Sequence, residues 1–182
     1  MLQIIIPANE YFVDSTQEFI YVKEQKLNLE HSLISISKWE SKWKKPFLGK
    51  DDKTYAESVD YVRCMTLNKD VDQRAYYGIP KTEFDKINKY ISDSMTATWF
   101  NDSNMPKRRN GTVVTSELIY YWMVAFNIPF DPCEKWHLNR LLTLIRIADI
   151  KNQPPKKMKA KDVGARNRAL NEARKKKLGT NG

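Results

Sequence analysis

Apolar residues between positions 138 and 150 recur at the spacing of an α-helix. One face would carry Leu138, Leu141, Leu142, Ile145 and Ala148, and it is widened by Leu144, Ile147 and Ile150. Upstream, Asp131 has the chemistry of a helix N-cap, Pro132 suits the first helical position, and Glu134 can complete a capping box. A helix over residues 131–150 with so broad an apolar face needs neighbours on more than one side. We therefore expect it to be the central helix of the core.

A second apolar segment lies just before this helix. Thr115 or Ser116 can start it, and residues 118–126 are apolar on every side apart from tyrosine hydroxyls, which predicts burial on nearly all faces. The short, proline-containing connection 127–130 should fold the two segments into an antiparallel helical hairpin at the centre of the molecule.

The N-terminal region combines strand and helix patterns. Residues 2–30 are rich in β-branched and aromatic residues, and the polar residues 14–16 separate 11–13 from 19–22 as in a hairpin, so we expect a small antiparallel sheet of two or three strands. Ser32 can cap a helix that Pro46 stops, with Trp39 and Trp43 on its apolar face. The two tryptophans could form a stacking platform for bases, but such platforms usually lie on sheets or loops, and core packing is the favoured interpretation.

Other segments complete a mainly α (α+β) fold. Residues 51–54 should open a helix that runs to about residue 65, with Tyr55, Val59 and Val62 inward. We also expect a helix over residues 82–91 and a single helical turn within residues 70–77. Residues 95–100 look extended. The predicted architecture is a helical core built on the central hairpin, with a small N-terminal antiparallel β element and a basic C-terminal tail. One core should contain Trp39, Trp122, Leu138, Leu141, Leu142 and Ile145.

Charge divides the chain into two parts. Residues 1–150 hold 20 Lys and Arg and 20 Asp and Glu, whereas residues 151–182 hold 11 Lys and Arg against 2 acidic residues, which accounts for the net charge of +9. We predict a compact body over 1–150 and a flexible or partly helical tail over 151–182, started by Pro154 and Pro155. A tail with so few apolar residues should be separable from the fold.

The basic tail indicates contact with an acidic partner, either nucleic acid or an acidic protein surface, and is equally typical of a solvated segment that aids solubility. A second basic cluster lies in the polar loop 101–111, where binding residues are often found. The candidate partner-binding residues are Lys156, Lys157, Lys159, Lys161, Arg166, Arg168, Arg174, Lys175, Lys176, Lys177, Lys107, Arg108 and Arg109.

Motifs for catalysis or cofactor binding are absent from the sequence. It has no Gly-rich phosphate loop, nucleophile elbow or Cys/His framework. Cys133 and His137 are one helical turn apart, but a zinc site needs about three or four protein ligands and His31 is the only other histidine. We expect no enzyme activity, no cofactor and no metal. With no signal-peptide pattern and no apolar run of about 18–20 residues, we expect an intracellular, soluble chain.

Several stretches resemble a family of small proteins from tailed bacteriophages. They are ISKWESKW at 36–43, MTATWF at 95–100, TSELIYYWM at 115–123, KWHLNRLLTLIR at 135–146, and PPKKM at 154–158 followed by RNRALN at 166–171. Members of this family are often regarded as tail assembly chaperones. The family has no catalytic motif, so the resemblance adds no active-site residues.

The resemblance implies a chaperone that binds the phage tape-measure protein, whose long apolar helices would otherwise aggregate in the host cytoplasm during tail assembly. Two alternatives remain. A virion structural protein, either a head-tail connector or a tail-completion subunit, would use the same body with the tail as a docking arm onto other tail proteins. A nucleic-acid-binding protein would act through the tail cations. A homo-oligomer is compatible with each role, and no membrane partner is expected.

Overall fold

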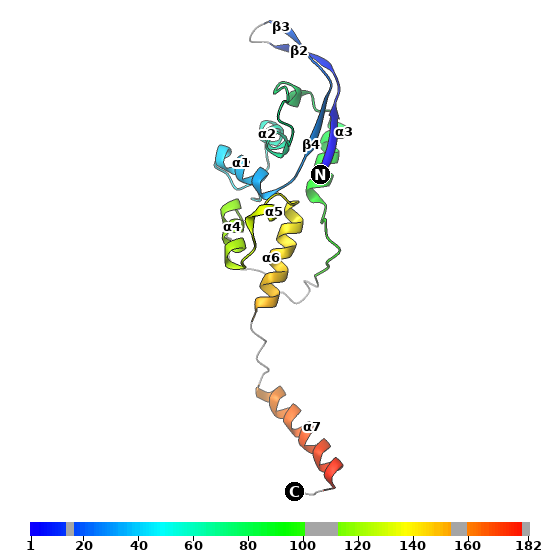
Figure 1. The fold of residues 1–182 in the computed structure, drawn as a ribbon, viewed down its shortest axis with the longest axis vertical. Helices are drawn as coiled ribbons and strands as arrows, with labels where there is room; N and C mark the ends of the chain where they lie inside the picture. The colour runs from blue at the N-terminus through cyan, green and yellow to red at the C-terminus, as the bar shows by residue number, and fades with distance from the viewer. Residues whose placement is uncertain (14–16, 101–112, 154–159, 180–182) are drawn as a thin grey trace. The chain divides into compact units, whose positions relative to one another are not determined.

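The computed structural model describes residues 1–13, 17–100, 113–153 and 160–179. The chain divides into two compact units, Met1–Asp149 and Ile150–Gly182. The first unit contains, in order, β1 (Leu2–Ile6), β2 (Asn9–Val13), β3 (Glu18–Val22), β4 (Gln25–Leu29), α1 (Leu33–Trp43), α2 (Tyr55–Met65), the 3₁₀ helix η1 (Ala75–Gly78), α3 (Lys81–Ser92), α4 (Ser116–Ala125), α5 (Phe130–Cys133) and α6 (Leu138–Asn152), whose end lies in the second unit. The second unit also contains α7 (Ala160–Leu178). The predicted mainly α fold with a small N-terminal antiparallel β element is confirmed (Figure 1).

The β element consists of two antiparallel pairs, β1 with β4 and β2 with β3. The predicted hairpin between residues 11–13 and 19–22 is present as β2 and β3, while its turn at 14–16 lies outside the described residues. The expectation of two or three strands was too low, because β1 and β4 form a second pair that continues the hairpin toward the helices (Figure 1). Their alternate side chains Ile4, Ile6, Leu27 and Leu29 are buried in the core.

Local capping signals account for the starts of α1 and α2. The Ser32 hydroxyl accepts the backbone N–H of Ser35 at 3.3 Å, as the sequence predicted for a helix beginning there. Thr54 and Glu57 form a complete capping box at the start of α2. Trp39 is buried and donates its indole N–H to the carbonyl of Glu57 at 2.9 Å, so the interpretation as core rather than base platform holds for this residue.

The prediction for the start of the 131–150 helix was wrong. Asp131 has non-helical φ/ψ within the short α5, its peptide bond to Pro132 is cis, and α6 begins only at Leu138. The backbone N–H of Leu138 donates to the carbonyl of His31 at 2.7 Å, and an isolated bridge joins His137 to Ser32. The start of α6 is therefore set by tertiary pairing with the segment before α1, and neither the Asp131 cap nor the Glu134 capping box forms.

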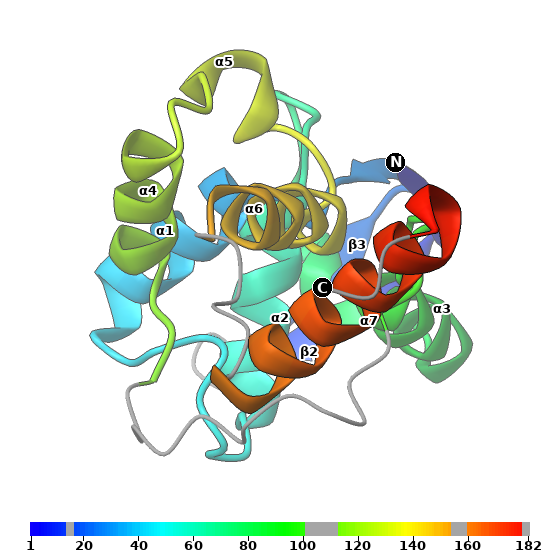
Figure 2. The same ribbon diagram turned by 90° about the horizontal axis from the view of Figure 1, so that it is seen from below.

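Two predictions of side-chain burial were also wrong. Tyr121 and Val124 are exposed, so α4 buries only the side that carries Ile119 and Met123. Tyr55, expected to point inward, is exposed, and its ring lies beside that of Phe84 of α3, with 5.9 Å between the centroids. α1 packs against both α2 and α4 and so occupies the place in the packing that we expected for the 131–150 helix (Figures 1 and 2).

One core cluster nevertheless includes most of the predicted residues. Trp39, Leu138, Leu141 and Ile145 are buried in it, and Trp122 and Leu142 are partly buried against it. The helix predicted over 82–91 is α3, and the single turn expected over 70–77 is η1. Residues 95–100, predicted to be extended, form no strand.

Candidate partner-binding surfaces

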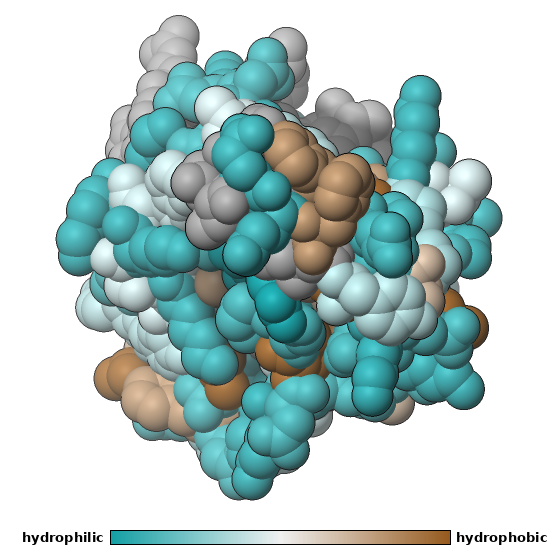
Figure 3. Space-filling view, turned by 90° about the horizontal axis from the view of Figure 1, so that it is seen from above, coloured by the Kyte–Doolittle hydropathy of each residue, from teal (hydrophilic) through white to brown (hydrophobic). Residues whose placement is uncertain are grey.

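The β2–β3 hairpin presents aromatic side chains to solvent. Phe12 and Phe19 lie opposite each other across the two strands with ring centroids 5.0 Å apart, yet 47% and 72% of their surfaces are exposed. Tyr21 on β3 is exposed as well. Such a cross-strand aromatic pair helps to hold a two-stranded hairpin that would otherwise be marginal in water. We call Phe12, Phe19 and Tyr21 the hairpin aromatic surface, and Figure 3, viewed from the hairpin end, shows hydrophobic residues open on this face.

A groove lies between residues 94–100 and α6. Its volume is about 520 Å³, and its walls include Trp99, Phe100, Leu142 and Arg146. Trp99 is 93% exposed, and the Arg146 guanidinium lies 3.9 Å from the ring centroid of Phe100. The groove therefore offers apolar and cationic surface side by side.

In the second unit, α7 is exposed along nearly its whole described length. Asp162 lies in its first turn and Lys175, Lys176 and Lys177 in its last turn, which is the arrangement that stabilises the helix dipole. Glu172 precedes Lys176 by four residues, a further favourable spacing. The helix thus holds cations on a regular scaffold without an apolar face that would require a core.

The predicted partner-binding residues divide between α7 and undescribed segments. Exposed positions on α7 are occupied by Arg166, Arg168, Arg174, Lys175, Lys176 and Lys177. Lys161 belongs to the same helix, and the structure does not describe its side chain. Outside the described residues lie Lys156, Lys157, Lys159, Lys107, Arg108 and Arg109.

The sequence reasoning missed the hairpin aromatic surface, although it predicted the hairpin. The small number of strands was an available signal. A ribbon of two strands has two faces and no core of its own, so some of its aromatic residues must face water unless a helix covers them. Trp99 gave no such signal, because nothing in its local sequence distinguishes an exposed from a buried tryptophan.

The two histidines meet in the core. Their ring centroids are 5.0 Å apart; His31 hydrogen-bonds the Tyr61 hydroxyl through Nδ1, and His137 donates from Nε2 to the carbonyl of Tyr90 at 3.0 Å. Burial and the neighbouring His137 lower the pKa of His31 from 6.5 to about 3, and burial also lowers the pKa of His137. Within the part of the chain that the structure describes, no group of three or more His, Cys, Asp or Glu side chains could hold a metal ion.

Comparisons with known protein families, curated proteins and solved structures found no match. Among residues 1–13, 17–100, 113–153 and 160–179, no helix is long and apolar enough to cross a membrane.

Proposed function

We propose that this protein is a tail assembly chaperone of a tailed bacteriophage and that it binds the tape-measure protein. The observation that carries the proposal is the hairpin aromatic surface, whose rings lie open to solvent instead of packing into the core. Exposed apolar surface of this kind marks sites of contact with other proteins. The resemblance to small phage proteins adds the identity of the partner.

A chaperone for long apolar helices needs apolar groups that are available without rearrangement. Burying one phenylalanine side chain against a client contributes about 1.5–3 kcal/mol. Because Phe12 and Phe19 already contact each other, part of the entropic cost of ordering them is met before the client arrives. The hairpin aromatic surface and the groove beside Trp99 would together supply the apolar contacts.

The cations of α7 would add attraction of a different kind. Contacts between exposed charges are screened within about 8–10 Å at ordinary salt concentrations, so their contribution should be largest at low salt. They would increase the rate of encounter with acidic segments of the client more than the final affinity.

Co-expression with the cognate tape-measure protein tests the proposal. The wild-type chain should keep the tape-measure protein in the soluble fraction. Phe19→Ser should reduce that fraction several-fold, because it removes a ring that is 72% exposed and belongs to the hairpin aromatic surface. Tyr121→Ser is the matched control, since Tyr121 is 64% exposed on α4 and belongs to neither apolar surface.

Mass spectrometry of purified virions supplies the opposing outcome. A chaperone should be absent from finished particles. If the tape-measure protein stays insoluble with and without this chain, and the chain is found in virions at fixed stoichiometry, the protein is a connector or tail-completion subunit instead.

A second candidate function, nucleic-acid binding, is favoured by the exposed cations of α7 alone. Binding of this kind loses affinity steeply as salt rises. Titration of unrelated DNA sequences at several salt concentrations would support it if all bind with the same steep salt dependence. Absence of binding at low salt would exclude it.

A further inference from the structure

A small pocket opens between α1, α2 and the segment that follows α2. Its volume is about 300 Å³, at the lower end of the range for small-molecule sites. Its lining includes the charged residues Lys38, Lys42, Asp60, Arg63 and Lys69 and the thiol of Cys64. Burial and Asp60 raise the pKa of the Cys64 thiol to about 11, so at neutral pH the thiol adds no negative charge.

Four cations face one carboxylate in this pocket, although residues 1–150 as a whole hold equal numbers of acidic and basic residues. The carboxylate of Asp60 is occupied, because it accepts from Lys42 and from the indole N–H of Trp43. Lys38 and Lys69 have no carboxylate partner among the residues that the structure describes. The charges of Lys38 and Lys69 are therefore unpaired among the described residues.

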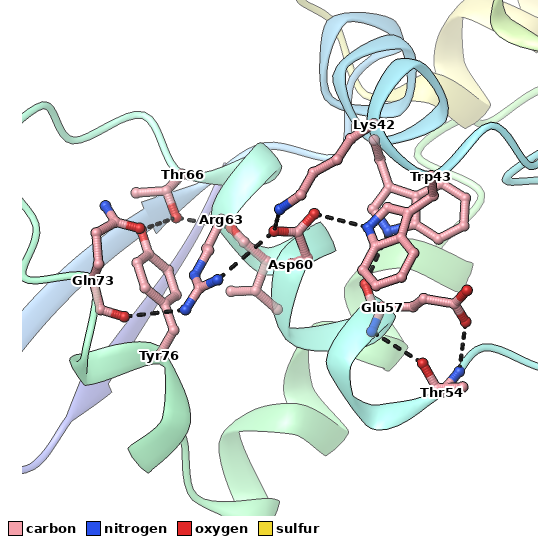
Figure 4. Close-up of polar contacts among 11 residues, drawn as sticks. Lys42, Trp43, Thr54, Glu57, Asp60, Arg63, Thr66, Gln73 and Tyr76 are labelled. Carbon is pink, nitrogen blue, oxygen red and sulfur yellow. Dashed lines mark hydrogen bonds and ion pairs between the residues drawn. The ribbon is translucent and has the colours of Figure 1, made fainter. Parts of the chain in front are cut away.

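Arg63 lines this pocket with its hydrogen bonding incomplete. Its guanidinium stacks 5.3 Å and 5.1 Å from the ring centroids of Tyr76 and Tyr77. One terminal nitrogen donates to the carbonyl of Gln73 at 3.2 Å, and the other is 3.7 Å from the Asp60 carboxylate (Figure 4). Its Nε is buried and finds no acceptor among the described residues. An unpaired buried N–H is costly. An anion in the pocket would accept from the remaining terminal N–H groups of the guanidinium, because the buried Nε is closed to solvent.

The backbone that carries Lys69 is held in place by β4. Leu67 donates its N–H to the carbonyl of Asn28 at 2.9 Å, and the side chain of Asn68 accepts the N–H of Asn28 at 2.7 Å. The Asn68 amide also donates to the carbonyl of Lys26 at 3.3 Å. The helices α1 and α2 form another wall of the pocket. Figure 4 shows that Lys42 of α1 and Arg63 of α2 converge there on Asp60. The cations are thus brought together by fixed elements, which lowers the cost of binding.

We propose that this pocket binds a phosphate group through Lys38, Lys69 and Arg63. Ammonium and guanidinium groups form strong charge-assisted hydrogen bonds to phosphate oxygens, and arginine presents its donors in a planar fork that suits them. The small volume fits inorganic phosphate or the phosphate of a mononucleotide. This site is independent of the proposed chaperone function.

Titration of the full chain with sodium phosphate, followed by ¹H–¹⁵N NMR at constant pH and ionic strength, tests the site. Amide resonances of residues 60–76 should shift and saturate. The double variant Lys38→Gln/Lys69→Gln should weaken binding by about tenfold, because it removes two charge-assisted contacts. Adenosine monophosphate in a parallel titration distinguishes the source: tighter binding than phosphate indicates a nucleotide, and equal binding indicates the oxyanion alone.

The control is Lys50→Gln/Lys89→Gln, which removes two exposed cations outside the pocket. Both double variants keep the eleven cations of the tail, so phosphate association with the tail is the same in each. Equal loss of affinity in the two double variants, or no shift of residues 60–76 in the wild type, would overturn the proposal.

Discussion

Buried carboxylates connect the helices of the first unit. Glu40 accepts the backbone N–H groups of Phe47 and Ser116, each at 2.7 Å, and so joins α1 to the start of α4. Glu57 pairs with Lys45, and this contact together with the Thr54 cap lowers the pKa of its carboxyl. A buried carboxylate is tolerated only when such partners are present. The sequence shows these residues as charges on helices, and only the packing shows that they are internal.

The buried His31 should make stability depend on pH. Its pKa in the folded state is lowered to about 3 by burial and by His137, whereas the unfolded chain protonates it near 6.5. The unfolded state therefore binds more protons between these values, and the free energy of unfolding should decrease as pH falls from 6.5 toward 3. Melting temperatures between pH 7 and pH 5, above the range where carboxylates titrate, should fall less steeply for His31→Asn than for wild type.

Asparagine keeps a hydrogen-bonding group near the Tyr61 hydroxyl, so His31→Asn separates loss of titration from loss of that contact. His137 remains in both proteins, so the acid sensitivity that its own burial causes is present in each curve. Parallel pH curves for the two proteins would contradict the assignment of the acid sensitivity to His31.

At the level of elements, helix starts were predictable where the cap is local. Ser32, Thr54 and Thr115 each accept a backbone N–H from the first turn of their own helix, and the sequence contains that information. The start of α6 was not predictable, because the hydrogen bond from Leu138 to His31 joins residues far apart in the chain. The sequence shows which residues can cap a helix, and the tertiary structure decides whether they do.

The buried side of α6 can be tested by two neighbouring leucines. Leu141 is fully buried, whereas Leu142 is partly buried and lines the groove beside Trp99. Leu141→Ala should lower the free energy of unfolding by about 2–5 kcal/mol, and Leu142→Ala by less, because a cavity forms only where atoms surround the site. Urea denaturation measures both. A cost for Leu142→Ala equal to that of Leu141→Ala would show that the side facing the core has been assigned incorrectly.

At the level of the whole molecule, charge segregation was readable from the sequence, but the assembled surfaces were not. The contrast between a neutral region and a basic region depends on composition alone. The pocket proposed to bind phosphate depends on Lys38, Arg63 and Lys69, which come from three separate segments. They meet through the packing of α1 on α2 and through the hydrogen bonds that join residues 67–68 to β4. The hairpin aromatic surface likewise depends on the tertiary structure, because β2 and β3 form a two-stranded sheet with no further strand beside them among the described residues.

Removal of residues 154–182 should leave the first unit stable. This cut keeps all of α6, which ends at Asn152, and removes α7, whose described side chains are exposed and belong to a separate unit. Too little apolar surface is buried by such a segment to contribute strongly to stability. Calorimetry should show one cooperative transition within a few degrees of the full chain. Loss of cooperative unfolding would mean that the tail packs onto the rest of the protein.

The same truncation separates the two kinds of contact in the proposed complex with the tape-measure protein. Without α7, affinity should fall at low salt and match that of the full chain at high salt, because only the charge contribution has been removed. Phe19→Ser in the full chain should weaken binding at every salt concentration, since apolar burial is not screened. Pull-down at low and high salt measures both. If the truncation abolishes binding at high salt and Phe19→Ser has no effect, the contact surface lies in the second unit instead.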